Sequence, residues 1–118
     1  MNKLIPAIIQ DVLTKDVLML GYMNNEALTK TVRTGWIYFW SRKRKKLWMK
    51  GEKSGNKLKL KEIYFDCDRD AILIKAELIA RNACLAGRQI CHTGNKTCFY
   101  RNAIKTPEPK TTPGVTGI

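Results

Sequence analysis

The chain has 118 residues, of which 44% are hydrophobic, and it carries a formal net charge of +12. This length suits one domain with a modest core and argues against a second domain of ordinary size. No apolar run is long enough to span a membrane, and the first residues do not follow a signal-peptide pattern. We therefore expect a cytoplasmic protein with no membrane partner, whose four cysteines are metal ligands or free thiols rather than disulfides.

The first third of the chain predicts a β-hairpin followed by a helix. Leu4 to Gln10 and Val17 to Tyr22 are strand-like, and a short polar turn separates them. Asn24 is suited to cap a helix over residues 25–34, because its side chain can accept a hydrogen bond from a free backbone N–H, and a glycine follows the last helical residue.

The middle of the chain predicts further β-structure. Trp36 to Trp40 and Leu47 to Met49 flank a basic turn and predict a second hairpin. Residues 57–65 predict a strand with a bulge at Glu62, where the alternation of apolar and polar side chains is broken. Residues 71–79 alternate regularly. The elements together predict a mainly β (α+β) fold, mostly antiparallel, with one short helix.

The end of the chain is different in composition. It holds three prolines and few large apolar residues, which is typical of a poorly ordered segment. We predict a domain over residues 1–104 and a flexible C-terminal tail over residues 105–118.

Positive charge is concentrated in one segment. Lys30 to Lys61 contains twelve Lys or Arg residues and a single acidic residue, Glu52. Such a segment favours a polyanionic partner, either nucleic acid or a phosphorylated small molecule, and the alternative is a solubilising surface. Gly51 and Gly55 in this segment allow backbone N–H groups to approach a phosphate. The side chains best suited to bind phosphate are Arg42, Arg44, Lys50 and Ser54.

Two short stretches, one acidic and one rich in cysteine, predict metal binding. Asp66, Asp68 and Asp70 alternate along the first, so in an extended segment they would share one face and Cys67 would lie on the other. Carboxylates suit a hard ion, whereas thiolates suit zinc. Aspartates are also common in solvated turns, which is the alternative interpretation.

The cysteine-rich stretch favours zinc. Cys91 and Cys98 are separated by six residues, enough for both to reach one ion, although this spacing is a weaker indicator than CxxC. Cys67 is the natural third ligand. Three thiolates leave a position open for a catalytic water, whereas four, with Cys84, would close a structural site. His92, the only histidine, could be a ligand, a surface residue or a general acid/base, and we favour the last.

Taken together, these stretches resemble the phosphoribosyl-AMP cyclohydrolase family, and the similarity covers roughly residues 4 to 101. Several sequence blocks in one order make the resemblance specific. The blocks are LMLGYMN at 18–24, WSRKR at 40–44, LWMKGEKSGN at 47–56, DCDRD at 66–70 and CHTGNKTCFYR at 91–101.

The resemblance implies a compact, barrel-like, mainly β domain that works as a homodimer with metal sites at the interface. It implies that Cys67, Cys91 and Cys98 bind zinc, with Cys67 contributed across the interface to the partner's two cysteines. It also implies that magnesium is the second metal. Its ligands would be Asp66, Asp68 and Asp70.

The implied reaction is hydrolysis of the N1–C6 bond in the adenine ring of 1-(5-phosphoribosyl)-AMP, the third step of L-histidine biosynthesis, by attack of a zinc-bound hydroxide on C6. His92 is our candidate for proton transfer. The two phosphate groups of this substrate explain the concentrated positive charge, and no nucleic-acid partner is then expected. Our candidate substrate-binding residues are Arg42, Arg44, Lys50, Glu52 and Ser54.

The sequence departs from the family pattern around residues 80–89, where the segment between Cys67 and Cys91 is longer. Cys84 lies in this insertion and could replace Cys67, close the site or have no role, and we expect the last. Two rivals remain. A basic nucleic-acid-binding protein with a structural zinc would use the same lysines, but three aspartates would repel phosphate. A zinc nucleobase deaminase would need an H-x-E and P-C-x-x-C signature, which is absent.

Overall fold

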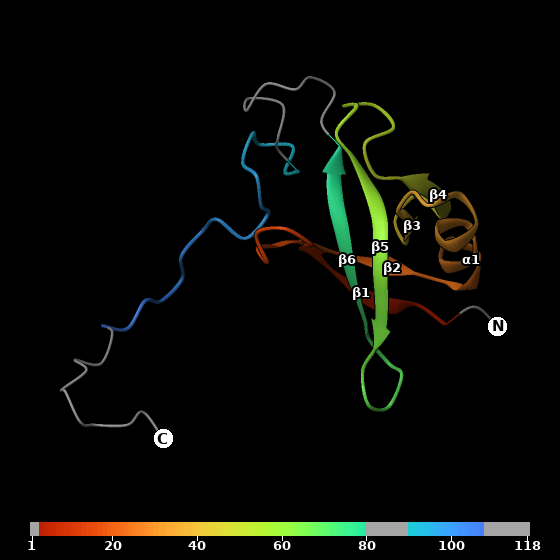
Figure 1. The fold of residues 1–118 in the computed structure, drawn as a ribbon, viewed down its shortest axis with the longest axis horizontal. Helices are drawn as coiled ribbons and strands as arrows, with labels where there is room; N and C mark the ends of the chain where they lie inside the picture. Colours follow the sequence, from red (N-terminus) through yellow and green to blue (C-terminus); the bar gives the residue numbers. More distant parts are fainter. Residues whose placement is uncertain (1–2, 80–89, 108–118) are drawn as a thin grey trace.

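A computed structural model describes residues 3–79 and 90–107 (Figure 1). Within them the sequence-based expectation of a mainly β fold with one short helix is confirmed, and the ends of the expected elements lie within two residues of those found. No helix in the described ranges has the length and apolar character needed to cross a membrane. The elements are β1 (Ile5–Asp11), β2 (Val17–Met23), α1 (Asn25–Thr34), β3 (Tyr38–Ser41), β4 (Lys46–Met49), β5 (Lys57–Phe65) and β6 (Ile72–Ile79).

Helix α1 begins and ends as its sequence predicts. The Asn24 side chain accepts a hydrogen bond of 2.8 Å from the backbone N–H of Ala27, which satisfies one of the free donors of the first turn. Gly35 adopts a left-handed conformation at φ 81°, and its N–H closes the last turn on the Thr31 carbonyl. Ala27 and Thr31 are buried, and the helix packs against β2 and β3.

Four strands form a mixed sheet in the order β2-β1-β6-β5. The β1–β2 and β5–β6 pairs are antiparallel, whereas β1 and β6 are parallel. Ile9 lies opposite Met19 on one side and Ile74 on the other, and all three are buried, so this face of the sheet forms the core. The expected bulge in β5 is confirmed, because the pairing with β6 shifts between Leu60 and Glu62.

The expectation of a barrel is wrong for the described residues. Strands β3 and β4 form a separate two-stranded sheet, so the four-stranded sheet keeps β2 and β5 as its edges. The chain approaches closure just before β3, where the Ile37 N–H donates to the Leu58 carbonyl and the Leu60 N–H donates to the Gly35 carbonyl. The hydrogen bonding to β5 does not continue beyond these residues. Strand β3 pairs with β4 instead.

One glycine is required by packing. Gly21 in β2 lies against the ring of Phe39, which is fully buried, and a Cβ at position 21 would lie 2.5 Å from the ring carbons. Only a residue without a side chain lets β3 pack this closely on β2.

The described end of the chain has no regular structure. Residues 99–107 are exposed and extend away from the sheet (Figure 1). The remainder of the expected tail lies outside the described residues, so the division at residue 104 stays a prediction.

Candidate active site

The three aspartates lie in the turn between β5 and β6, residues 66–71, and not in an extended segment as expected. This segment is named the aspartate turn. The Asp66 N–H donates to the Ala71 carbonyl, and Arg69 adopts a positive φ of 61°. The Asp66 carboxylate also accepts hydrogen bonds from the backbone N–H groups of Asp70 (2.9 Å) and Ala71 (3.2 Å). These bonds curl the chain around the first carboxylate, as aspartates often do in turns.

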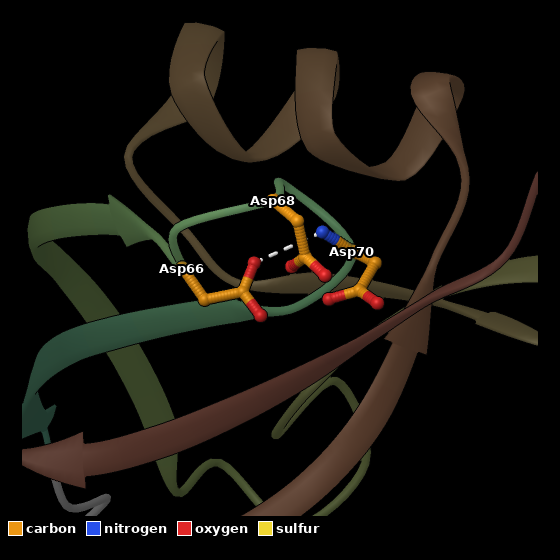
Figure 2. Close-up of side chains that lie close together, drawn as sticks. All are labelled: Asp66, Asp68 and Asp70. Atoms are coloured by element: carbon orange, nitrogen blue, oxygen red, sulfur yellow. Dashed lines mark hydrogen bonds between the residues drawn. The ribbon is translucent and has the colours of Figure 1, made fainter.

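The turn still brings the three carboxylates together. One oxygen from each of Asp66, Asp68 and Asp70 lies within 4.8 Å of the others, and Figure 2 shows the three side chains converging. All three are exposed. The convergence that the sequence predicted is therefore present, but the turn produces it and not the alternation of a strand. Exposed carboxylates at this spacing fit a hard cation such as magnesium.

The neighbouring carboxylates shift the pKa values of Asp66 and Asp70 in opposite directions. The side chains of Asp68 and Asp66 raise the pKa of Asp70 to about 6, because neighbouring negative charges and hydrogen bonds favour its neutral form. Partial desolvation opposes a fall in the pKa of Asp66, but the hydrogen bonds it accepts from Asp70, Ala71 and Asp68 lower it. The three carboxylates repel one another when ionised, and a divalent cation bound among them would relieve this repulsion.

Cys91 and Cys98 are brought together by a compact loop over residues 90–98, here named the cysteine loop. The N–H of Cys91 donates to the Asn95 carbonyl and the N–H of Gly94 donates to the Cys91 carbonyl, with Gly94 at φ 97°. Both cysteines are free thiols and line one cavity of about 400 Å³. His92 is exposed and lines the same cavity. The structure therefore brings together three of the residues singled out in the sequence.

The two thiols have different electrostatic surroundings. Hydrogen bonds from Thr93, whose hydroxyl lies 3.0 Å from the Cys91 Sγ, lower the pKa of Cys91. Partial desolvation and the neighbouring Cys91 raise the pKa of Cys98, although this residue is exposed at the surface. One thiol is therefore ready to ionise first, and a bound metal ion would deprotonate both. Two thiolates at an accessible cavity fit zinc, provided that a further ligand is supplied.

Lys50 was expected at a phosphate, and the structure places it against the cysteine loop. Its Nζ donates a hydrogen bond of 2.7 Å to the Ile90 carbonyl, next to Cys91. Burial lowers the pKa of Lys50, and the nearby Cys98 and Cys91 oppose this shift. Lys50 thus connects the end of β4 with the cysteines, a contact over 40 residues of sequence that no local pattern could reveal.

A second set of contacts to this loop was not predicted from the sequence. Lys96 binds the β1–β2 turn, and its Nζ lies 3.1 Å from Asp11 Oδ2 and 3.0 Å from Asp16 Oδ2. The Thr97 hydroxyl and the Cys98 N–H both donate to carbonyls of β2. These partners are about 80 positions away in the sequence.

The other expected substrate-binding residues fall into two surface cavities. Arg44, Lys50, Glu52 and Ser54 line one of about 220 Å³. Arg42 lines a different cavity of about 590 Å³, where its guanidinium stacks on the Tyr22 ring at 4.1 Å. Trp48 lines both, so the two cavities are neighbours.

Cys67 does not join the other two cysteines within one chain. It lies in the turn before β6, whereas Cys98 is hydrogen-bonded to Leu18 of β2, which is level with Ile74 and Lys75 in the middle of β6. Figure 1 shows the turn and the residue 90–98 segment at opposite ends of the β5–β6 hairpin. Cys84 and the insertion at 80–89 lie outside the described residues.

Comparisons with known proteins agree with the sequence blocks. The family model for phosphoribosyl-AMP cyclohydrolase matches residues 19–100. A phosphoribosyl-AMP cyclohydrolase of Solibacter usitatus is 53% identical over 98 residues, which are 83% of this chain and 72% of that protein. The enzyme of that name from Archaeoglobus fulgidus is 55% identical over 98 residues, with 83% of each chain covered.

A longer relative contains the same region. The histidine biosynthesis bifunctional protein HisIE of Caldanaerobacter subterraneus subsp. tengcongensis is 54% identical over 99 residues, and the chain spans 44% of its length. The residues of this chain that match the family model include the β3–β4 hairpin with its basic turn, the aspartate turn and the cysteine loop. The chain belongs to the phosphoribosyl-AMP cyclohydrolase family, a family of hydrolases.

Proposed function

We propose that this chain opens the adenine ring of 1-(5-phosphoribosyl)-AMP by hydrolysis of the N1–C6 bond, a step of histidine biosynthesis. The observation that carries the proposal is the shared cavity of Cys91, His92 and Cys98, beside a half-buried lysine, in a chain of this family. A cytoplasmic location stays a prediction.

The chemistry requires a strong nucleophile at C6 and a proton for N1, because the ring carbon is electrophilic but aromatic. Zinc held by Cys91, Cys98 and a third thiolate would supply Lewis acidity and a water activated near neutral pH. The exposed His92 ring borders the same cavity, so it can reach a substrate there and carry the proton for N1.

The substrate's phosphates would be held beside this cavity. Arg44, Lys50 and Ser54 line one surface and offer charged and hydroxyl donors, with Glu52 at its border for a sugar hydroxyl. Arg42 flanks it in the neighbouring cavity. Magnesium on the aspartate turn would neutralise charge on a phosphate. These assignments account for the basic segment without a nucleic-acid partner, and the family membership does not favour the nucleic-acid-binding alternative.

We place Cys67 in the site of a second copy of the chain. It is exposed and lies at the wrong end of the β5–β6 hairpin to reach Cys91 and Cys98 of its own chain. Because Cys67 sits between Asp66 and Asp68, the magnesium ligands would enter the partner's site together with it. One copy would then supply the aspartate turn, and the other would supply the cysteine loop, His92 and Lys50.

The outer face of the sheet is a suitable surface for the second copy. The strand register places Leu20 beside Ile8, Ile8 beside Leu73 and Leu73 beside Tyr64. One apolar row therefore crosses all four strands, on the face of the sheet opposite to the face that carries Ile9. Leu20 is 42% exposed and Tyr64 is 47% exposed. Burial of such a row is the usual driving force for a homodimer.

The activity is tested by ultraviolet monitoring of phosphoribosyl-AMP with zinc-loaded protein and magnesium. A matched sample stripped by chelator should be inactive, and added zinc should restore the ring opening. An intact nucleotide in the presence of verified zinc and dimeric protein would overturn the proposal.

The shared site is tested by mixing two inactive variants, Cys67→Ser and Cys98→Ser, under conditions that exchange subunits. Half of the dimers would be mixed, and each would carry one intact and one doubly damaged site, so activity should recover to about one quarter of wild type. No recovery, with subunit exchange verified, would show that each chain builds its zinc site alone.

A further inference from the structure

Lys96 uses all of its hydrogen-bond donors within the chain. An ammonium group has three donors. The Lys96 Nζ lies 3.1 Å from Asp11 Oδ2, 3.0 Å from Asp16 Oδ2 and 3.1 Å from the Thr14 hydroxyl. No donor remains for a substrate phosphate, although Lys96 lies between the two cysteines in sequence.

Its partners form a rigid support. Asp11 is at the end of β1 with only 8% of its side chain exposed, and its carboxylate also accepts from the backbone N–H groups of Leu13 and Thr14. The Asp11 N–H and the Asp16 carbonyl close the same turn at 2.8 Å. Lys96 therefore binds to a fixed point on the sheet, and not to a loose side chain.

The residues after Lys96 are fixed to the neighbouring strand. The Thr97 hydroxyl donates to the Val17 carbonyl at 2.6 Å, and the Cys98 N–H donates to the Leu18 carbonyl at 2.7 Å. Leu18 is fully buried in the core. The position of the Cys98 backbone relative to the core is thus set by three consecutive residues that bind one hairpin.

The same side of the loop also fixes Cys91. The N–H of Ile90 donates to the carbonyls of Asn95 and Lys96, and the N–H of Cys91 donates to the Asn95 carbonyl. Displacement of Lys96 would therefore move both cysteines, since the chain before Cys91 is bonded to the backbone at Lys96.

We propose that Lys96, through Asp11 and Asp16, is a positioning residue that holds Cys91 and Cys98 at the spacing needed to bind zinc. It does not contact the substrate. This role rests on the proposed zinc site and adds to it a support from the β1–β2 turn. Outer partners of this kind typically change metal affinity by about 10–100-fold when they are removed.

The test compares Lys96→Met with Lys96→Arg and with Lys15→Met. The first removes the charge at similar length, the second keeps a charged donor, and the third removes one charge from the same turn without a bond to the loop, since the Lys15 Nζ donates to Val12. Zinc affinity is measured by competition with a chromophoric chelator, and the visible spectrum of the cobalt-loaded protein reports the ligand geometry. Circular dichroism verifies folding, and Asp16→Asn provides a milder variant if Lys96→Met does not fold.

We expect Lys96→Met to weaken zinc binding by about 10–100-fold and to alter the cobalt spectrum, Lys96→Arg to recover most of the affinity, and Lys15→Met to match wild type. In metal-free protein, amide hydrogen exchange at Cys98 should be faster in Lys96→Met. Unchanged affinity and exchange would overturn the positioning role, as would a raised KM with normal zinc binding.

The zinc-binding measurement on wild type and on Lys96→Met separates this inference from the proposed function. If wild-type protein binds no zinc, the proposed function fails at that step and the positioning role for zinc fails with it. If wild type binds zinc and Lys96→Met binds it equally well, only the positioning role fails.

Discussion

The aspartate turn and the cysteine loop are the two candidate metal-binding segments, and they are held in place by opposite means. Hydrogen bonds that shape the aspartate turn join residues no more than five positions apart. The cysteine loop is attached through contacts that span 40 or more positions, from Lys50 on one side and the β1–β2 turn on the other. A local segment can form its carboxylate cluster alone, whereas the thiols depend on the whole sheet.

This difference has a consequence for folding and for metal loading. The three aspartates should be nearly in place as soon as the β5–β6 hairpin exists. Cys91 and Cys98 should converge only when β1, β2 and β4 are in place, because long-range contacts form only after the intervening chain has been ordered.

The largest expected effect comes from removing a zinc ligand. Cys98→Ser should abolish stoichiometric zinc binding and reduce ring opening by more than about 100-fold, since loss of outer partners alone costs up to that factor. Metal analysis and the ultraviolet assay measure both. Cys84→Ser is the matched control and should keep zinc and activity, and loss of zinc in this control would contradict the three-ligand assignment.

A core substitution should separate the two segments. Gly21→Ala would force Phe39 away from β2, because the new Cβ would lie 2.5 Å from its ring, and should lower the free energy of unfolding by about 1–3 kcal/mol. Since β2 also binds the cysteine loop, zinc affinity should fall while magnesium affinity stays near wild type. Thermal unfolding and calorimetric titration with each metal measure this, and an equal loss of both affinities would contradict the local character of the aspartate turn.

The aspartate turn should show a break in metal affinity near pH 6, whereas zinc binding at the cysteine loop should weaken steadily as the pH falls, because both thiols must lose their protons. Because the pKa of Asp70 is raised to about 6, a proton competes with magnesium below that value. Magnesium affinity should therefore fall by up to about tenfold for each pH unit below 6. Titrations between pH 5 and 8 measure this dependence, and Asp70→Asn should bind more weakly at every pH with no step near 6.

The same shift predicts the stability of the metal-free protein. A folded-state pKa above the unfolded value of 3.8 stabilises the fold at pH below 3.8, and this contribution is lost as the pH rises through about 6. Thermal unfolding should show this loss, and magnesium should remove it, because the cation takes the place of the proton. Absence of any magnesium effect above pH 6 would argue against a metal at this turn.

The smallest expected effect lies in the helix, which carries none of the proposed metal ligands. Asn24→Ala removes the hydrogen bond to the Ala27 N–H and should cost about 1 kcal/mol of stability. Neither metal affinity should change. Denaturant unfolding gives the free energy, and Asn24→Ser, which keeps a capping oxygen, is the control.

Much of the fold could be predicted from the sequence because its signals are local. Asn24 and the glycine after residue 34 define the helix, and the broken alternation at Glu62 marks the bulge. The parallel pairing of β1 with β6 could not be predicted from the sequence, because these strands are more than 60 positions apart. The expected barrel failed for a similar reason, since whether β3 pairs with β5 or only with β4 depends on how distant strands approach.

For the site, the amino-acid sequence by itself determined which chemical groups are available: three clustered carboxylates, the Cys91 and Cys98 thiols, one histidine and a concentrated basic segment. It also carried the family resemblance. Only the tertiary structure decided that a turn makes the carboxylates converge, that Lys50 reaches the cysteine loop and that Lys96 is fully used by Asp11, Asp16 and Thr14. Local geometry follows from neighbouring residues, whereas a charge finds its partner only when the packed sheet brings distant segments together.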